Sequence, residues 1–523
     1  MPKSLSQGRR ATVAAALTLA AVTCPTVHAH ASSSRVIVRA ERGVDSERLS
    51  AAVRRADGQI VRDLHLISGL GVRIGPAGAE RLERDPVVAS VTADARVTPS
   101  AVPLTPATGA TISSSALLAA HPFSSNATRA WQTKPYGTGK GVGVAVIDTG
   151  IAGDLPDFRA SLKDATSRVV ASTVVNPSAT SATDGYGHGT HVAGLIAGNG
   201  WNRATSDPLR GRYIGTAPEA NLISIKVSDE HGEASLMDVI YGLQFAVDRR
   251  SAFGIRVVNL SLNSTEARDP DNDPLDAAVE AAWFKGLVVV VAAGNRGTAS
   301  DAVFYPPAND PYALTVGAVD DKGTTGIEDD VLAEWSSRGS TETGITKPEI
   351  LAPGAHIVSA LASDSDFAAL CPVCVVSGKY FRVGGTSMAA AIVSGAAAVV
   401  IQTNPTWSND AVKGALMNSF RVVLGTGREV SVDKARRAAP DLRVSNVGLR
   451  PSALIDPATS GLDYDALGLS AATWSPAVDP LRARWTNANF TCDCGAASTT
   501  DGQTADTTRA RWTRARWSAE FTK

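Results

Sequence analysis

The feature that most constrains the fold is a regular alternation of apolar runs of strand length with helical stretches across residues 131–425. Continuous Val/Ile runs that alternate with helices predict a parallel sheet covered by helices on both faces, and therefore an α/β fold. Functional groups are then expected at the carboxyl ends of the strands. The runs lie at residues 141–148, 222–227, 256–262, 287–293 and 314–319, and the helical stretches at 188–197, 235–251, 274–285 and 386–403.

A smaller unit precedes this region at residues 32–97. It contains no pair of His or Cys residues, so the sequence predicts a small α+β domain without chemistry of its own. Alternating and helical apolar spacing predict the order strand, helix, strand, helix, strand, over residues 35–38, 46–55, 64–74, 79–84 and 87–97.

Composition changes on both sides of the α/β region. Residues 98–130 are rich in Pro, Ser, Thr and Ala, which is typical of an exposed linker open to proteolytic cleavage. Residues 426–523 hold four of the nine Trp and three copies of Arg-Ala-Arg-Trp. This C-terminal extension is interpreted either as a degenerate repeat in an exposed tail or as an Arg/Trp surface that adheres to cell envelope or polysaccharide.

The N-terminus has the pattern of a secretory signal peptide over residues 1–31. Basic residues precede an uncharged apolar run at 11–22, and small residues at Ala29 and Ala31 suit signal peptidase. The run is too short to span a membrane, and no later stretch of about 18 or more apolar residues replaces it. A lipid anchor at Cys24 and twin-arginine export are weaker alternatives. The sequence predicts a secreted, extracellular protein without a transmembrane segment.

The remaining cysteines form two close pairs, Cys371 with Cys374 and Cys492 with Cys494. In an exported protein they predict disulfides, whose pairing the sequence does not fix. A four-thiolate zinc site is the alternative, weakened by the 118 residues between the pairs (492 minus 374). A thioredoxin-like redox role for the first pair is weaker still, because no βαβ pattern surrounds it.

The charge balance excludes one class of function. The chain has 50 Lys and Arg against 51 Asp and Glu. A protein that binds nucleic acid through bulk positive charge is therefore excluded, and no nucleic-acid partner is expected.

Four short windows each present one polar residue where a strand ends or a helix begins. They are Asp148 in V-A-V-I-D-T-G-I, His188 in D-G-Y-G-H-G-T-H-V-A-G, Asn295 in V-V-V-A-A-G-N and Ser387 in G-G-T-S-M-A-A-A. Singly, such residues are commonly turn or cap residues. His191 is interpreted as structural, because metal-binding helix pairs more often have i, i+4 spacing with a Glu between.

Together these residue types supply the parts of a nucleophilic hydrolase. A serine hydroxyl is unreactive until a base takes its proton, and the base needs a partner that holds its tautomer. A backbone N–H at a helix start and a primary amide can both donate to developing negative charge. An esterase of the α/β-hydrolase type is the alternative, but it requires G-x-S-x-G and the order Ser, Asp, His, and the sequence has neither.

The four motifs, in the order Asp, His, Asn, Ser, resemble those of the subtilisin-like serine peptidases. The resemblance covers about residues 130–420 and includes K-P-E-I-L-A-P-G at 347–354. Residues 35–97 resemble the family's inhibitory propeptide. The resemblance implies a subtilisin-like parallel sheet with helices on both faces, preceded by a small α+β propeptide domain. A catalytically inactive member that serves as a binding protein is the competing class, and the intact quartet argues against it.

The resemblance implies a role for each motif residue in hydrolysing protein or peptide substrates through an acyl-enzyme. Ser387 would be the nucleophile, His188 the general base, and Asp148 the residue that orients the imidazole. Asn295 and the Ser387 N–H would form the oxyanion hole. The strand at 259–262 would pair with an extended substrate. The residues expected to border the substrate are Asn259, Leu260, Ser261, Gly294 and Gly385.

The resemblance also implies cofactors and regulation. No cofactor is needed for the chemistry, and a structural calcium ion is expected at Asp157, nine residues after Asp148. Residues 32–97 would act as an intramolecular inhibitor that keeps the enzyme a zymogen until it cuts itself within 98–130. The active protein is expected to be a monomer.

Departures from the family pattern bear on specificity. Asn263 stands where Gly is frequent and adds a side chain at the groove rim, and Phe304 is expected to shorten the pocket for the substrate residue before the scissile bond. The stretch at 362–379 looks like an insertion that borders the groove. Ala391 and Ile392 replace a frequent Pro-His, which a helix should tolerate because Ala is a good helix former.

Overall fold

The computed structural model describes residues 33–100, 102–103 and 119–455 apart from five isolated positions, together with two short strands at 489–490 and 510–511. The predicted signal peptide at 1–31, Cys492 and Cys494 therefore lie outside the described residues, as do the C-terminal tryptophans.

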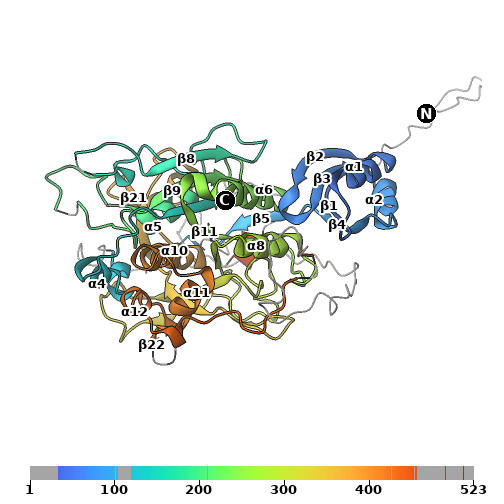
Figure 1. The fold of residues 1–523 in the computed structure, drawn as a ribbon. Helices are drawn as coiled ribbons and strands as arrows, with labels where there is room; N and C mark the ends of the chain where they lie inside the picture. Colours follow the sequence, from blue (N-terminus) through green and yellow to red (C-terminus); the bar gives the residue numbers. More distant parts are fainter. Residues whose placement is uncertain are drawn as a thin grey trace, which may run out of the picture.

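A long sheet forms the centre of the molecule (Figure 1). Its strands follow the order β22-β23-β18-β14-β13-β11-β7-β9-β8, with β15 paired to β14. All pairs from β23 to β8 are parallel, whereas β22 and β15 are antiparallel additions. The bounds are β7 Gly143–Asp148, β8 Val169–Val174, β9 Asn221–Lys226, β11 Ile255–Leu260, β13 Val288–Ala292, β14 Leu314–Asp320, β15 Val331–Leu332, β18 Ile350–Pro353, β22 Arg421–Val423 and β23 Gly427–Glu429.

Helices cover both faces of this sheet, which confirms the predicted α/β class. Along β7, Val144 and Val146 lie in one apolar core, and Ala145 and Ile147 lie in another. Successive strand side chains point to opposite faces, so a strand that is apolar throughout requires cover on both sides. The first core is completed mainly by α5 His188–Ala197, α10 Thr386–Thr403 and α11 Asn409–Asn418, and the second by α6 Leu236–Asp248 and α8 Pro274–Phe284.

Helix α10 is a core helix. Among the described residues it is the one helix long and apolar enough to cross a membrane, and 89% of its apolar window is buried inside the molecule. Burial on every side explains its unbroken apolar composition.

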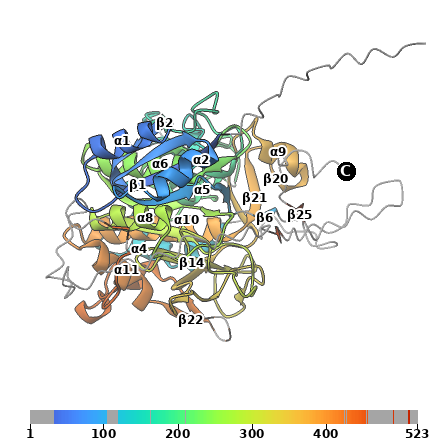
Figure 2. The same cartoon turned by 90° about the vertical axis from the view of Figure 1, so that its right-hand side faces the viewer.

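Residues 34–93 form a small domain with its own core, which stands beside the large domain in Figure 1 and faces the viewer in Figure 2. Its antiparallel sheet has the order β2-β3-β1-β4. The predicted strand at 64–74 is wrong, because a helical turn at His65–Ile67 divides that stretch and a further strand precedes it. The elements are β1 Ser34–Ala40, α1 Ser46–Arg55, β2 Gln59–Leu64, η1 His65–Ile67, β3 Gly69–Ile74, α2 Pro76–Glu83 and β4 Val88–Ala93.

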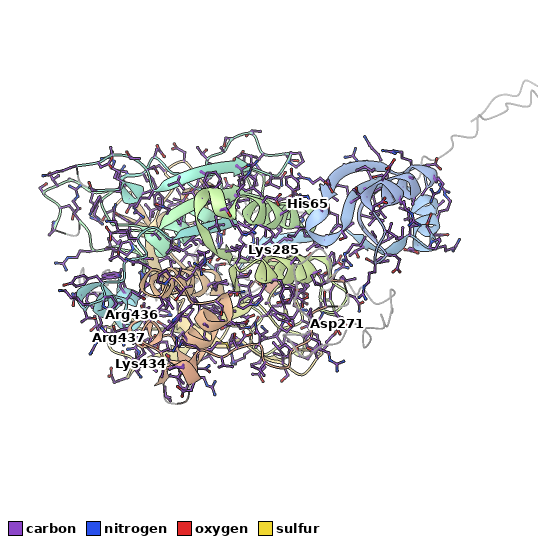
Figure 3. The ribbon with its side chains drawn as sticks, in the orientation of Figure 1. His65, Asp271, Lys285, Lys434, Arg436 and Arg437 are labelled. Atoms are coloured by element: carbon purple, nitrogen blue, oxygen red, sulfur yellow. A yellow bond between two sulfur atoms is a disulfide. The ribbon has the colours of Figure 1, made fainter. Side chains whose placement is uncertain are left out.

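The small domain sits on α6 of the large one. Asp94 caps this helix by accepting a hydrogen bond from the Met237 N–H at 2.8 Å, and Arg62 pairs with Asp238 at 3.0 Å. His65 lies at the same junction, with Nε2 3.3 Å from Asp248 Oδ1 (Figure 3). Because Asp94 and Asp238 are buried and face arginines, this contact is specific in geometry and charge.

The predicted exposed linker at 98–130 is wrong at both of its described ends. Ser100 is 5% exposed, and Ala127 and Ala130 are fully buried. The domain boundary predicted at 425 is too early, because β23 joins the central sheet and residues up to 455 pack on it. Local composition cannot reveal such burial, since the partners are far away in sequence.

The remaining elements are short and connect or edge these layers. They are β5 Arg96–Pro99, β6 Val102–Pro103, α3 His121–Ser124, α4 Ala127–Gln132, η3 Pro156–Phe158, β10 Ala234–Ser235, α7 Arg250–Phe253, β12 Leu262–Ser264, β16 Gly339–Ser340, β17 Thr346–Lys347, β19 Ile357–Ala360, α9 Asp366–Leu370, η4 Pro372–Cys374, β20 Val375–Val376, β21 Tyr380–Gly384, α12 Val432–Ala435, η5 Pro440–Leu442, β24 Asn489–Phe490 and β25 Ala510–Arg511.

Candidate active site

Asp148 and His188 form a buried pair at the carboxyl end of the sheet. Asp148 is the last residue of β7, and His188 is the first residue of α5. His188 Nδ1 lies 2.7 Å from Asp148 Oδ1, and both side chains are buried. His188 Nε2 has no hydrogen-bond partner among the described residues. The carboxylate therefore fixes the ring by one nitrogen and leaves the other available to accept a proton.

The loop before His188 is held by Asp184, which the sequence prediction missed. Its carboxylate accepts hydrogen bonds from the N–H groups of Gly187 and Thr190, both at 2.7 Å, and from the Thr149 hydroxyl at 2.8 Å. Burial raises the pKa of this carboxyl, and the three donors oppose that rise. Asp184 thus ties the start of α5 to the end of β7. The D-G-Y-G window preceding His188 was the available signal.

Gly189 permits the close approach of these two elements. A Cβ at this position would lie 2.2 Å from the Gly150 carbonyl oxygen, well inside contact distance. No side chain fits there, so the glycine after His188 is needed for the Asp148–His188 contact.

Ser387 is the second residue of α10, which packs against α5. Its Oγ donates a hydrogen bond to the Ser261 carbonyl at 3.0 Å, and its N–H donates to the Ser100 carbonyl at 3.2 Å. The hydroxyl is not bonded to His188 in this structure. Catalytic hydrogen bonds are commonly loose before the reacting complex forms, and rotation about one side-chain bond redirects this hydroxyl.

Asn295 presents its amide N–H₂ group without a partner. Its Oδ1 accepts from both the N–H and the hydroxyl of Thr386 at 3.1 Å, which fixes which end of the amide is the oxygen. Its Nδ2 is buried and has no hydrogen-bond partner among the described residues. An oriented, unpaired amide donor held by Thr386, the residue before Ser387, is suited to stabilise an oxyanion.

The substrate-like occupant of this site is the chain's own segment at 96–100. Strand β5 lies between β10 and β12 in a three-stranded antiparallel sheet, with Val97 opposite Ser264 and Pro99 opposite Leu262. The Ser100 N–H continues the ladder by donating to Ser261 O at 3.1 Å. Beyond it, β6 pairs antiparallel with β21. The backbone therefore crosses the site with the Ser100 carbonyl directed at the Ser387 N–H.

The strand that pairs with β5 overlaps the strand predicted to pair with substrate, 259–262, only in residues 261–262, and pairing with a substrate itself stays a prediction. Asn259 and Leu260 lie in β11, inside the central sheet, and the pairing strand comprises residues 261–264. The Asn259 side chain bonds Ser261 Oγ and Ser394 and does not touch β5. Gly294 and Gly385 do border the site: the Gly294 N–H donates to Thr386 Oγ1 at 3.0 Å, and Gly385 starts α10.

The segment at 362–379, expected to be an insertion, packs against the His188 imidazole. The Phe367 ring lies 6.1 Å from the His188 ring and 5.3 Å from that of Tyr186, centre to centre. Cys371 and Cys374 form a disulfide, which confirms this part of the cysteine prediction and excludes a four-thiolate zinc site that uses them. This segment therefore shields the Asp148–His188 pair from water on one side.

Asp157 offers a poor site for the predicted calcium ion. Its Oδ1 accepts from the Tyr380 hydroxyl at 3.0 Å, and its backbone carbonyl accepts from Arg168 at 3.1 Å. Calcium takes about six to eight oxygen ligands, and among the described residues no group of three or more His, Cys, Asp or Glu side chains is arranged to hold a metal. These contacts argue against an ion at this carboxylate, so calcium at Asp157 stays an untested prediction.

The substitution Asp157→Asn tests what this carboxyl does. Burial raises the pKa of Asp157 to about 6, so the folded state holds the proton more tightly than the unfolded chain. Its contribution to stability is full below about pH 4 and is lost as the pH rises to about 6. In chelator at pH 8, we expect the free energy of unfolding of the variant to exceed that of the unsubstituted chain by up to about 3 kcal/mol, and its melting temperature to be higher. At pH 4 the two proteins should differ little in stability. A chelator-induced fall in melting temperature that is abolished by the substitution would instead establish the calcium site.

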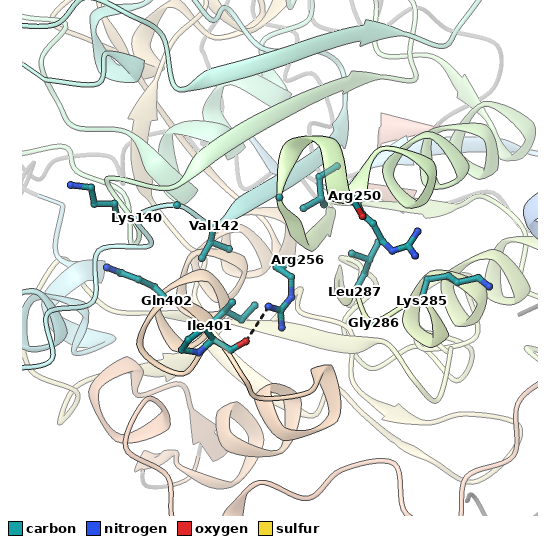
Figure 4. A pocket seen from close by; sticks show the side chains of 14 residues that line it. Lys140, Val142, Arg250, Arg256, Lys285, Gly286, Leu287, Ile401 and Gln402 are labelled. Atoms are coloured by element: carbon teal, nitrogen blue, oxygen red, sulfur yellow. Dashed lines mark hydrogen bonds between the residues drawn. The ribbon is translucent and has the colours of Figure 1, made fainter. Parts of the chain in front are cut away.

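A cavity at the opposite edge of the sheet is not part of this site. It measures about 640 Å³ and lies at the amino ends of β7, β11 and β13 (Figure 4). Four basic side chains and no acidic ones line it, from Lys140, Arg250, Arg256 and Lys285. The polar groups described above lie at the carboxyl ends of the same strands, where chemistry is expected in a parallel sheet.

Comparison with known proteins agrees with this arrangement. The model of the Subtilase family matches residues 139–446. The serine protease AprX of Bacillus subtilis is 40% identical over 286 residues, which are 54% of this chain and 61% of AprX. The match thus spans less than two thirds of that relative. An alkaline protease of Alkalihalobacillus alcalophilus is 32% identical over 69% of this chain and 76% of its own length.

The fold has a solved relative. Fervidolysin from Fervidobacterium pennivorans, a keratinolytic enzyme related to subtilisin, superimposes with a TM-score of 0.58 at 23% identity, covering 78% of this chain and 61% of fervidolysin. At this identity the likeness concerns the fold alone. The family model matches more than half of the chain, and the alkaline protease is 32% identical over 76% of its own length. The protein therefore belongs to the subtilase family.

Proposed function

We propose that this protein is a secreted serine endopeptidase, made as an autoinhibited precursor, that hydrolyses peptide bonds through an acyl-enzyme on Ser387. One observation carries the proposal. The Ser100 carbonyl accepts a hydrogen bond from the Ser387 N–H, beside the unpaired amide of Asn295. A peptide carbonyl thus contacts one of the two proposed oxyanion donors, and the second donor, Asn295 Nδ2, has no partner among the described residues, which supports the proposal.

The proposed chemistry follows from the groups around that carbonyl. His188 takes the Ser387 proton on Nε2 as the oxygen attacks, and later gives it to the leaving amine. Asp148 holds the Nδ1 tautomer and stabilises the imidazolium. The Ser387 N–H and Asn295 Nδ2 bind the oxyanion. Water then hydrolyses the acyl-enzyme. Every step uses residues of the chain, and none requires a metal ion.

The proposed inhibition rests on the placement of the small domain. Its contacts with α6 hold it on the catalytic domain, and β5 fills the groove between β10 and β12. Ser387 and His188 are fully buried under this cover. We infer that the precursor is inactive toward other proteins until it cuts the bond after Ser100. This narrows the predicted cleavage interval, 98–130, to one bond.

Secretion is supported by the N-terminal pattern at 1–31 and by the redox state of the cysteines. A disulfide between Cys371 and Cys374 is stable in an oxidising compartment. Substrates are proposed to be proteins and peptides, as the names of the related proteases suggest. The active form is proposed to be a monomer.

A fluorophosphonate probe tests the proposed function directly. We expect the processed protein to be labelled on Ser387 and to begin at residue 101. The variant His188→Ala should lose labelling by several orders of magnitude, because the serine loses its base. His356→Ala, at a histidine of the large domain whose side chain is 45% exposed, is the matched control and should label normally after processing. A correctly folded protein that neither labels nor cleaves any peptide would establish the inactive binding protein instead.

A further inference from the structure

The Ser100 side chain is hydrogen-bonded to the side-chain amide of Asn263. Ser100 Oγ donates a hydrogen bond to Asn263 Oδ1 at 2.6 Å. Asn263 in turn donates through Nδ2 to the Ala292 carbonyl at 3.1 Å. The Asn263 side chain is 2% exposed. The Asn263 side chain therefore links β12 to the end of β13. It also contacts the side chain of Ser100, the residue before the proposed scissile bond.

Arg296 limits the same space from the other side. A Cβ on Gly294 would lie 2.9 Å from Arg296 Nη1 and 3.1 Å from Asn263 Oδ1, so both polar groups approach one point. The guanidinium is fixed there, because Nη2 donates to Ser264 O at 3.2 Å and the group stacks 3.5 Å from the centre of the Tyr305 ring. A long substrate side chain would have to displace a bonded amide and a stacked cation.

Resting on the proposed peptidase function, we propose that Asn263, held by Ala292 and supported by Arg296, makes the enzyme select a small residue, preferably serine, before the scissile bond. Serine supplies the donor that Asn263 Oδ1 accepts. Alanine fits the space but leaves that buried oxygen without the bond, and an aromatic residue does not fit. This assigns the restriction to Asn263, which the sequence analysis placed at the groove rim, and to Arg296, whereas the sequence analysis expected Phe304 to shorten the pocket.

Peptide substrates that copy β5 test the assignment. The full chain is expressed, allowed to process, and assayed with acetyl-Val-Thr-Pro-X-p-nitroanilides in which X is Ser, Ala or Phe. We expect kcat/KM to be about tenfold higher for Ser than for Ala, and at least about 100-fold higher than for Phe. In Asn263→Gly the Ser-to-Ala ratio should fall to about one, and the Phe substrate should gain about tenfold. Asn263→Ala, which adds no backbone freedom, should give the same change in ratio.

The controls separate this inference from the proposed function. Asn272→Gly makes the same substitution in a loop away from β5 and should leave all three ratios unchanged. An unsubstituted enzyme that cleaves after Phe as well as after Ser, or ratios that Asn263→Ala does not change, would overturn the role of Asn263 while leaving a peptidase. Absence of cleavage of every peptide, together with absence of fluorophosphonate labelling, would overturn the peptidase itself.

Discussion

The variant Ser387→Ala should be exported as the uncut precursor and should lose about 10⁶-fold in kcat, the size of the effect measured when a subtilisin loses its nucleophile. The loss is large because the oxyanion donors and the His188–Asp148 pair have no attacking oxygen to assist. Mass spectrometry and N-terminal sequencing of the secreted protein should find the bond after Ser100 intact.

Ser408→Ala is the matched control for this experiment. Ser408 caps α11 by accepting a hydrogen bond from the Ala411 N–H, and it touches no group of the active site. It should cost about 1 kcal/mol of stability and leave processing unchanged. A Ser387→Ala protein that still matured to a first residue of 101 would show that another protease makes the cut.

The variant Asn295→Ala should lower kcat by about 10² to 10³-fold and change KM little, which is the effect known for the equivalent amide of a subtilisin. The reason lies in the direction of the amide: two bonds from Thr386 hold its oxygen, so its N–H₂ group is free for the negative charge that appears only in the transition state.

Asn404→Ala provides the same substitution at the opposite end of α10. Asn404 donates to Arg436 O at 2.9 Å, so its loss should lower the melting temperature without changing kcat. A decrease in kcat of less than about threefold for Asn295→Ala would contradict the oxyanion role, since one lost donor in a dry site costs more than that.

Much of the catalytic fold could be predicted from local pattern. Helices α5 and α10 begin and end where the sequence predicts, because a glycine just before each helix, Gly187 or Gly385, marks the start and an apolar run marks the length. The motif residues also stand at strand ends in the predicted way. In contrast, β2 was missed because its alternation follows directly on the Asp57-Gly58 turn and is cut short by η1.

The errors share a physical cause, which is stabilisation by partners remote in sequence. Residues 98–100 were assigned to the linker from their composition, yet their backbone is paired by residues 261–263. Residues near 446 have no strong periodicity, yet Asn446 accepts from the buried Lys413 at 2.7 Å, and the Ser452 N–H binds Glu280. The shift of the pairing strand from 259–262 to 261–264 is a matter of register, which only the facing strand β5 determines.

If the proposed cut after Ser100 activates the precursor, the division of the crossing segment between two sheets has a consequence for that activation. Before the cut, β5 and β6 are consecutive, and the tether presents the inhibitory strand to the groove at a high effective concentration. After the cut, β5 stays with the small domain and β6 stays with the body, so rebinding becomes an encounter between two separate molecules. The proposed cut would thereby change inhibition from an intramolecular contact, which does not depend on protein concentration, into a bimolecular complex that dissociates on dilution.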